Sequence, residues 1–164
     1  MNKTTIKRNT NGDSRVAKSS PTISEFTDAV ILHRNDVKQM MNNVAEAISM
    51  QALDHDWSKV KEPYRSMFYR DLCNTIEGKM EFMDGEWSRL HYNELERHHL
   101  TKRHPEDVNL IDVIEMVCDC VCAGMARSGD VYDVDIPAEV LTLAVKNTVE
   151  LLKENTLVVT DKQP

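Results

Sequence analysis

Hydrophobic residues recur at helical spacing along most of the chain. Between residues 26 and 48 the apolar side chains follow one another mostly three or four positions apart, which predicts one face of an amphipathic helix. Thr22 and Glu25 form a capping-box pattern directly before this stretch, so we expect the helix to begin there. His33 lies on the same apolar face.

The pattern predicts more helices and no strands. We expect a second helix over residues 64–76 behind Pro63, a third over 86–99, and a last one that opens at Pro137. Residues 110–127 are apolar on nearly all sides, which is typical of a helix in the middle of a bundle. No glycine-rich phosphate loop or internal repeat interrupts the series. The predicted fold is all-α, a single helical bundle.

Polarity divides the chain into three parts. Residues 1–20 are polar and almost devoid of large apolar groups, so they are expected to form a flexible N-terminal arm that folding does not need. The helical domain is expected over residues 21–157, with a C-terminal tail at 158–164. A length of 164 residues suits one domain with a core of its own.

Charge narrows the class of partner. The net charge of -7 argues against binding to duplex nucleic acid, whose phosphates are usually neutralised by clustered Lys and Arg, so we expect a small substrate. No apolar run approaches the roughly 20 residues that span a bilayer, and the N-terminus lacks the apolar stretch of a signal peptide. We therefore expect no membrane contact and a cytoplasmic location. The four cysteines show neither disulfide spacing nor a Cys-x-x-Cys pair, which indicates free thiols.

Four polar, metal-capable side chains stand where the pattern calls for core. They are His33 on an apolar face, the adjacent pair His55 and Asp56, and Asp119 within the most apolar helix. A single buried histidine is commonly just hydrogen-bonded, but a buried carboxylate costs several kcal/mol unless something pairs with it. One divalent cation held jointly by the four residues would satisfy them all.

This order of residues resembles the HD-domain superfamily of metal-dependent phosphohydrolases. The resemblance covers roughly residues 24–155. Within the superfamily the chain is similar to a small group of HD-like proteins, often encoded by phages, whose elements here read HDWSK at 55–59, HHLTKRH at 98–104 and MVCD at 116–119.

The resemblance implies that His33, His55, Asp56 and Asp119 are the metal ligands and that the substrate is a nucleotide or related small phosphate ester. Such ligands suit Mn, Fe, Co, Ni, Zn or Mg and leave positions for water and a phosphoryl oxygen. Lys59 is expected either to neutralise a substrate phosphate or to be a solvated lysine. HD nucleotidases often carry a glutamate near this position, and its replacement here leaves the general acid open. A phage-encoded protein would act in the host cytoplasm.

A second histidine cluster, His98, His99 and His104, admits three interpretations. These side chains can be a solvated loop, ligands of a second metal ion, or proton donors to the leaving oxygen, so one or two ions per chain are expected. We assign His99 and His104 to the catalytic set. His91 precedes the cluster and is expected to be a weaker member that faces solvent.

The predicted helix that carries Asp119 contains further candidate site residues. Asp112 and Glu115 lie roughly on the side of Asp119 and are expected either to orient ligand imidazoles or to be exposed. Arg127 is expected to bind phosphate or to interact with the helix dipole. Two other functions stay open: a catalytically inactive HD-fold module that binds nucleotides or a host protein, as in phage counter-defence, and a helical interaction protein without metal. The oligomeric state also stays open, with a homodimer among the options.

Overall fold

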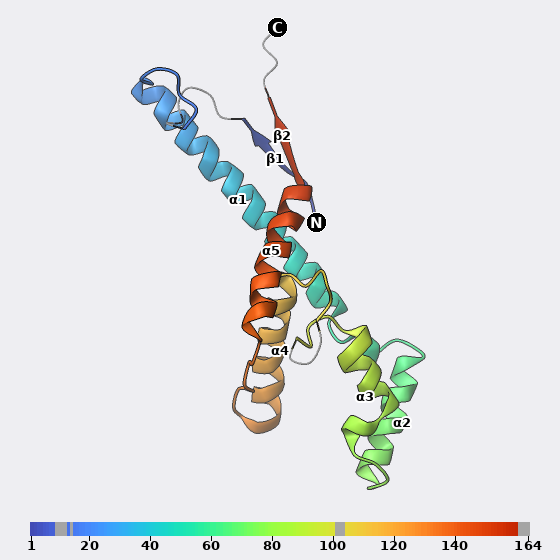
Figure 1. Ribbon diagram of the computed structural model, residues 1–164. Helices are drawn as coiled ribbons and strands as arrows, with labels where there is room; N and C mark the ends of the chain where they lie inside the picture. The colour runs from blue at the N-terminus through green and yellow to red at the C-terminus, as the bar shows by residue number, and fades with distance from the viewer. Residues whose placement is uncertain (9–12, 14, 101–103, 161–164) are drawn as a thin grey trace. The chain divides into compact units, whose positions relative to one another are not determined.

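Helices dominate the structure, a computed structural model that describes residues 1–8, 13, 15–100 and 104–160. Five α-helices carry most of the chain (Figure 1): α1 (Ile23–Asp54), α2 (Tyr64–Ile76), α3 (Glu86–Leu90), α4 (Leu110–Ser128) and α5 (Ala138–Glu154). Two short 3-10 helices, η1 (Trp57–Lys59) and η2 (Phe82–Asp84), and one π-helical segment, η3 (His91–Leu95), lie between them. The prediction of an all-α fold is confirmed. None of the helices in the described ranges has the length and apolar character needed to cross a membrane.

The chain divides into two compact units. Met1–Ala47 and Val149–Pro164 make up the first unit, and Ile48–Thr148 makes up the second. Both boundaries fall inside continuous helices, α1 and α5, so no break in the hydrophobic pattern marks them.

The first unit contains two short parallel strands, β1 (Thr4–Lys7) and β2 (Thr156–Val159), with Thr4 opposite Thr156 (Figure 1). Thr4 is buried, and its hydroxyl accepts a 2.8 Å hydrogen bond from Asn43 of α1. The sequence pattern predicted no strand and a flexible arm over residues 1–20. For Thr4–Lys7, which form β1, this prediction was wrong. A four-residue strand is too short to show alternation, and its partner lies some 150 residues away along the chain.

The N-terminus of α1 is capped as predicted. The Glu25 amide donates to the Thr22 hydroxyl at 3.2 Å, and the Thr22 amide donates to the Glu25 carboxylate at 2.7 Å. These hydrogen bonds from Thr22 lower the pKa of Glu25. The apolar face that follows was expected to be core, yet α1 buries none of its residues, and Phe26 is 52% exposed.

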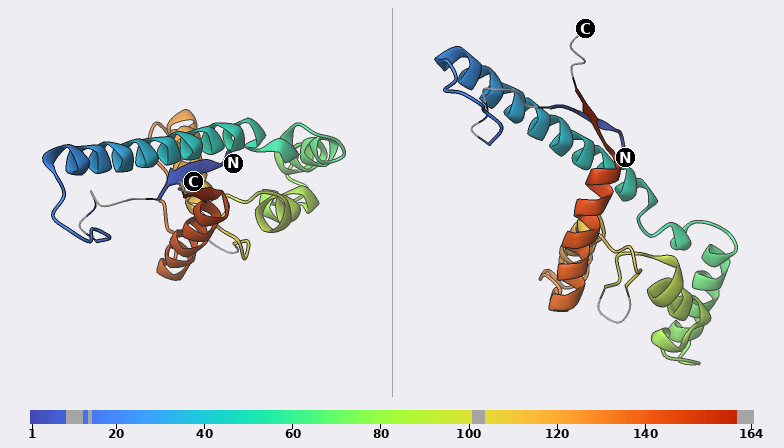
Figure 2. Two further views of the ribbon diagram at one scale, coloured as in Figure 1. Left: turned by 90° about the horizontal axis from the view of Figure 1, so that it is seen from above. Right: turned by 45° about the horizontal axis from the view of Figure 1, so that its top comes forward.

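The core of the second unit forms between α4 and α5, which run alongside each other in Figure 1 and in the right-hand view of Figure 2. Its buried members are Leu100, Val108, Met116, Val140 and Ala144. The Asn147 side-chain amide donates to the backbone carbonyls of Glu106 and Val108, which fixes the segment that leads into α4. Asn109 then caps α4 by accepting a hydrogen bond from the Ile111 amide.

α4 is buried on one face only, so its expected place in the middle of a bundle is a wrong prediction. Ile114, Val117 and Val121 are each about two-fifths exposed, whereas Met116 is buried. The uniform apolar composition could not reveal which side would be covered.

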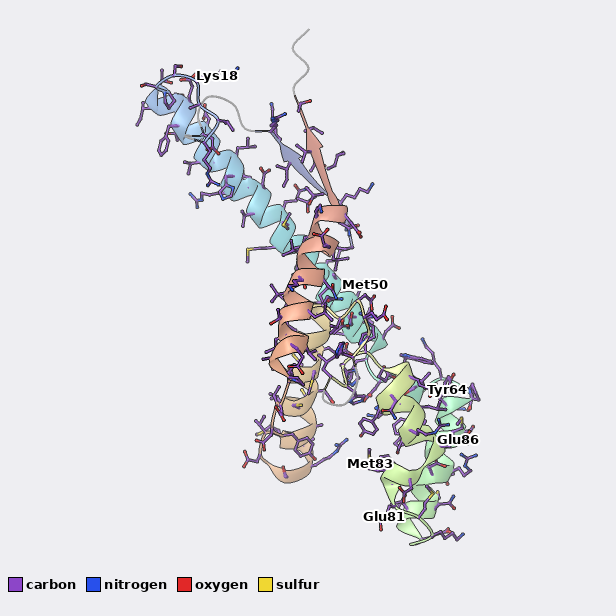
Figure 3. The ribbon with its side chains drawn as sticks, viewed as in Figure 1. Lys18, Met50, Tyr64, Glu81, Met83 and Glu86 are labelled. Atoms are coloured by element: carbon purple, nitrogen blue, oxygen red, sulfur yellow. The ribbon has the colours of Figure 1, made fainter. Side chains whose placement is uncertain are left out.

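A second layer of the same unit consists of η1, α2, η2 and α3. Figure 3 shows the side chains of α2 and α3, with Tyr64 and Glu86 marking where the two helices begin. The buried Asp71 of α2 accepts a 2.8 Å hydrogen bond from the Trp87 amide and so holds the first turn of α3. A Cβ at Gly85 would lie 2.8 Å from an Asp71 carboxylate oxygen, which explains the glycine there. The Trp87 indole packs on Phe68 at 4.1 Å and is 1% exposed.

Candidate metal centre

The His55-Asp56 pair follows the end of α1, where the chain turns sharply. Asp56 has φ 56° and ψ 29°, in the left-handed region that Asp and Asn enter more readily than most residues. His55 Nε2 lies 3.4 Å from Asp56 Oδ2, so the two neighbouring side chains meet at one point.

α4 and the segment after η3 bring two more groups to this point. Asp119 Oδ1 lies 3.6 Å from His55 Nε2, and Asp119 Oδ2 lies 4.0 Å from His98 Nε2. His98 Nε2 is also 4.0 Å from Asp56 Oδ1. The sequence predicted that Asp119 would be buried, but its side chain is 27% exposed. Its close neighbours are the imidazoles of His55 and His98.

Two further imidazoles lie on the other side of Asp56. His91 Nε2 is 3.6 Å from Asp56 Oδ1 and 2.8 Å from His99 Nε2. His91 stacks on Trp87 at 4.2 Å and is 1% exposed, so its expected exposure to solvent was wrong. The π-helical geometry of η3, in which His91 is the first residue, places this ring inside the unit.

The Nδ1 atoms of three of these imidazoles, the ring nitrogens that point away from Asp56, lie close to polar side chains. His55 Nδ1 makes a 2.9 Å hydrogen bond with Glu115 Oε1, and His98 Nδ1 lies 3.0 Å from the same oxygen without good hydrogen-bond alignment. His91 Nδ1 makes a 2.8 Å hydrogen bond with the buried Ser58 hydroxyl. A partner on Nδ1 leaves Nε2 as the nitrogen that faces Asp56, which is the usual arrangement of metal-binding histidines.

Glu115 is itself fixed on its far side. Gln51 donates its side-chain amide to Glu115 at 2.6 Å and to Asp112 at 2.9 Å. Asp112 is fully buried, accepts two hydrogen bonds from Arg97 at 2.8 and 2.9 Å, and accepts from the Asn109 amide. Of the two carboxylates predicted to orient imidazoles, Glu115 therefore contacts them directly, and Asp112 supports Glu115 through Gln51.

Three buried atoms in this cluster have no hydrogen-bond partner among the described residues: Asp56 Oδ1 and both ring nitrogens of His98. Asp56 Oδ1 and His98 Nε2 lie 4.0 Å apart. A buried polar atom without a partner costs about 1–3 kcal/mol. A further group that binds both Asp56 Oδ1 and His98 Nε2 would remove this cost.

Most charges of the cluster favour the protonation states of metal ligands, and His98 is the exception: burial lowers its pKa, but the neighbouring carboxylates Glu115, Asp56 and Asp119 outweigh burial and raise it. Burial, with repulsion between the neighbouring imidazoles, lowers the pKa of His91 and of His99 to about 3, so both rings are neutral near pH 7. Burial raises the pKa of Asp56, but the hydrogen bond and charge of Lys59 outweigh it and keep the net shift downward. Glu115 has a pKa lowered to about 2, because contacts with His98, Gln51 and His55 outweigh its burial. Neutral imidazoles and ionised carboxylates are the forms that bind cations.

The distances fit a cation. Ligand atoms about 2.1 Å from a tetrahedral metal ion lie about 3.4 Å apart, close to the separations of 3.4–4.0 Å found here. Three groups of ligand atoms are close enough to share an ion: His55, Asp56 and Asp119; His55, His98 and Glu115; and Asp56, His91 and His99. Asp56 belongs to two of them, so its two carboxylate oxygens can serve two neighbouring ions.

Not all predicted site residues meet here. His55, Asp56 and Asp119 do, and Lys59 forms an ion pair with Asp56 Oδ2. His33 is exposed on α1 in the first unit and is absent from these ligand groups, so its role as a ligand stays a prediction.

His104 lies outside the three ligand groups, but it lines a small pocket of about 150 Å³ together with His99 and Tyr92. From the sequence, His91 was predicted to face solvent, and His98 was placed in the second histidine cluster without a definite role. Their spacing in the sequence gave no signal, because η3 is π-helical and ends at Leu95, before His98.

Comparison with known proteins identifies the family to which the chain belongs, but its function is unknown. A family model with the description "Family of unknown function (DUF5662)" matches residues 22–157. Neither a curated protein nor a solved structure was found to match the chain.

Proposed function

The chain belongs to the DUF5662 family, and we propose from the geometry of its candidate metal centre that it is a metal-dependent phosphohydrolase of the HD superfamily, acting in the cytoplasm on a nucleotide or related small phosphate ester. The free, exposed thiols of Cys118 and Cys122 suit that compartment.

The observation that carries the proposal is that Asp56 Oδ1 and both ring nitrogens of His98 are buried without hydrogen-bond partners in the described part of the chain, with Asp56 Oδ1 and His98 Nε2 4.0 Å apart. A lone pair on imidazole nitrogen and a carboxylate oxygen can both be satisfied by one cation, whereas a hydrogen bond between them would require His98 to carry its proton on Nε2. The 4.0 Å separation is too long for that bond and suits a shared ion.

The chain's own residues would hold and orient the ion. Asp56, His55 and Asp119 would supply an imidazole and two carboxylates, and His98 Nε2, 4.0 Å from both Asp56 and Asp119, would supply a second imidazole. Glu115 fixes the ring of His55 in the orientation that binding needs. Mn, Fe, Co, Ni, Zn and Mg all accept such ligands. The bound ion would supply Lewis acidity, which lowers the pKa of water and polarises a phosphoryl oxygen.

Other side chains of the site match the needs of phosphate chemistry. Lys59, whose ammonium group pairs with Asp56, is close enough to place a positive charge beside a phosphoryl oxygen. His99 and His104 line one pocket, and His99 also belongs to the ligand group of Asp56, His91 and His99, so His104 can give a proton to the leaving oxygen there.

The number of ions is one or two. A second ion would use Asp56, His91 and His99, rather than the His98, His99 and His104 set that the sequence suggested. Two ions bound to one bridging carboxylate would hold attacking and leaving oxygens together, which favours phosphodiesters. A single ion suffices for a phosphomonoester.

Phosphate release by manganese-loaded protein from 4-nitrophenyl phosphate and from nucleoside monophosphates tests the proposal, with metal content measured on the same samples. His98→Ala should lose most of its metal and its turnover, because it removes a buried ligand. His33→Ala is the matched comparison: the site geometry predicts little change, whereas the HD-type order of residues predicts loss. Full metal content and turnover in His98→Ala would refute the site, and absence of turnover in metal-loaded wild type would refute the activity.

A further inference from the structure

An apolar pocket of about 220 Å³ opens beside the candidate metal centre, within the second unit. Its nonpolar lining comes from the last turns of α1 and from one face of α4: Ile48, Ala52, Ile111, Ile114, Cys118 and Cys122. Its polar lining consists of Gln51, His55, Glu115 and Asp119. One cavity therefore joins a hydrocarbon surface to two ligands of the metal centre.

The polar residues of the lining contact one another. Gln51 donates to Glu115 at 2.6 Å, Glu115 binds His55 at 2.9 Å, and His55 Nε2 lies 3.6 Å from Asp119. His55 and Asp119 are the two lining residues that also belong to the candidate metal centre, so the phosphoryl group of a bound ligand would lie next to them. The rest of the ligand then faces the nonpolar lining.

The lining residues exclude strongly polar occupants. They include no Lys or Arg, so a second or third phosphate would lie beside carboxylates without a compensating charge. A purine or pyrimidine needs partners for the hydrogen-bonding groups on its edge, and the amide nitrogen of Gln51 is already bonded to Asp112 and Glu115. An uncharged hydrocarbon group meets neither difficulty.

We propose that this pocket binds the apolar alcohol part of the substrate, so that among small phosphate esters the protein selects aryl or branched alkyl esters over nucleoside polyphosphates. This inference rests on the proposed function, because it places the phosphoryl group at the metal centre. Specificity then comes from α1 and α4, while the histidine cluster handles the phosphoryl group.

Two non-hydrolysable phosphonates test the inference by binding rather than by turnover. Manganese-loaded protein should bind benzylphosphonate at least about tenfold more tightly than methylphosphonate, because the ring buries additional apolar surface. Ala52→Phe, which fills the pocket from α1, should reduce that ratio toward one. Leu53→Phe is the matched control: it adds a ring at the next residue of the same helix, which is 77% exposed and does not line the pocket, and should keep the ratio.

A second readout uses the cysteines. Benzylphosphonate should slow alkylation of Cys118 and Cys122 more than methylphosphonate does, with Cys73 of α2 as the reference within the same protein. Equal binding of the two phosphonates, or a ratio that survives Ala52→Phe, would overturn the inference and leave the phosphohydrolase proposal standing. Binding of neither phosphonate by metal-loaded protein would contradict the proposed function, and the inference with it.

Discussion

Replacing Glu115 with glutamine tests whether the carboxylate that touches two imidazoles controls the affinity for metal. Glu115 Oε1 lies 2.9 Å from His55 Nδ1 and 3.0 Å from His98 Nδ1, and it is ionised because its pKa is lowered to about 2. Glutamine keeps the shape and one carbonyl oxygen but removes the negative charge, so the two rings lose their fixed orientation and part of their basicity.

The expected magnitude follows from these contacts. Loss of one partner that orients a metal-binding imidazole costs roughly 10-fold to 100-fold in metal affinity. Because Glu115 serves two imidazoles, we expect the upper end, about 100-fold, which corresponds to about 2.7 kcal/mol of binding free energy. The substitution removes no hydrocarbon from the core, so the far-ultraviolet circular dichroism spectrum should not change.

The assay is competition for Mn²⁺ between the protein and a chelator of known affinity, at one fixed pH and salt concentration. Glu139→Gln, a change of the same kind at an exposed position of α5, is the control and should bind like wild type. An affinity of Glu115→Gln within twofold of wild type, with a native spectrum, would refute the reasoning that Glu115 orients the ligands.

Three further predictions follow from other contacts. Arg97→Ala should lower the free energy of unfolding by about 3 kcal/mol in a denaturant titration, because it leaves the fully buried Asp112 without its guanidinium partner; exposed Arg89→Ala should cost far less, and equal costs would contradict the account. His104→Ala should keep the metal content while lowering turnover, since His104 lies outside the ligand groups, and loss of metal would make it a ligand. A chain that starts at Pro21 lacks β1 and should melt at a lower temperature than the full chain, whereas an unchanged temperature would restore the view that residues 1–20 are dispensable.

Local signals in the sequence predicted the helices well. The predicted capping pair of Thr22 with Glu25 is formed, because such a pair acts within one turn and needs no distant partner. β1 escaped detection because its stability depends on pairing with Thr156–Val159 at the far end of the chain. The exposure of α4 depends on packing that a period of 3.6 residues does not encode.

Part of the candidate site could be predicted from the sequence, because some of its residues break the local hydrophobic pattern. His55, Asp56 and Asp119 stood out as polar groups in apolar surroundings, and the structure brings them together. His91 belongs to the site only because a π-helical segment and stacking on Trp87 turn it inward, and neither can be recognised from spacing.

The most direct test of the metal centre is the metal content of protein purified without chelators, measured for wild type and for Asp56→Asn. Asparagine tolerates the left-handed backbone at this position, so the variant should fold while losing the charge that two ligand groups share. We predict one or two divalent ions per wild-type chain and a small fraction of that in Asp56→Asn. Wild-type protein without bound metal even after loading with Mn²⁺, or equal content in Asp56→Asn, would contradict the existence of this centre.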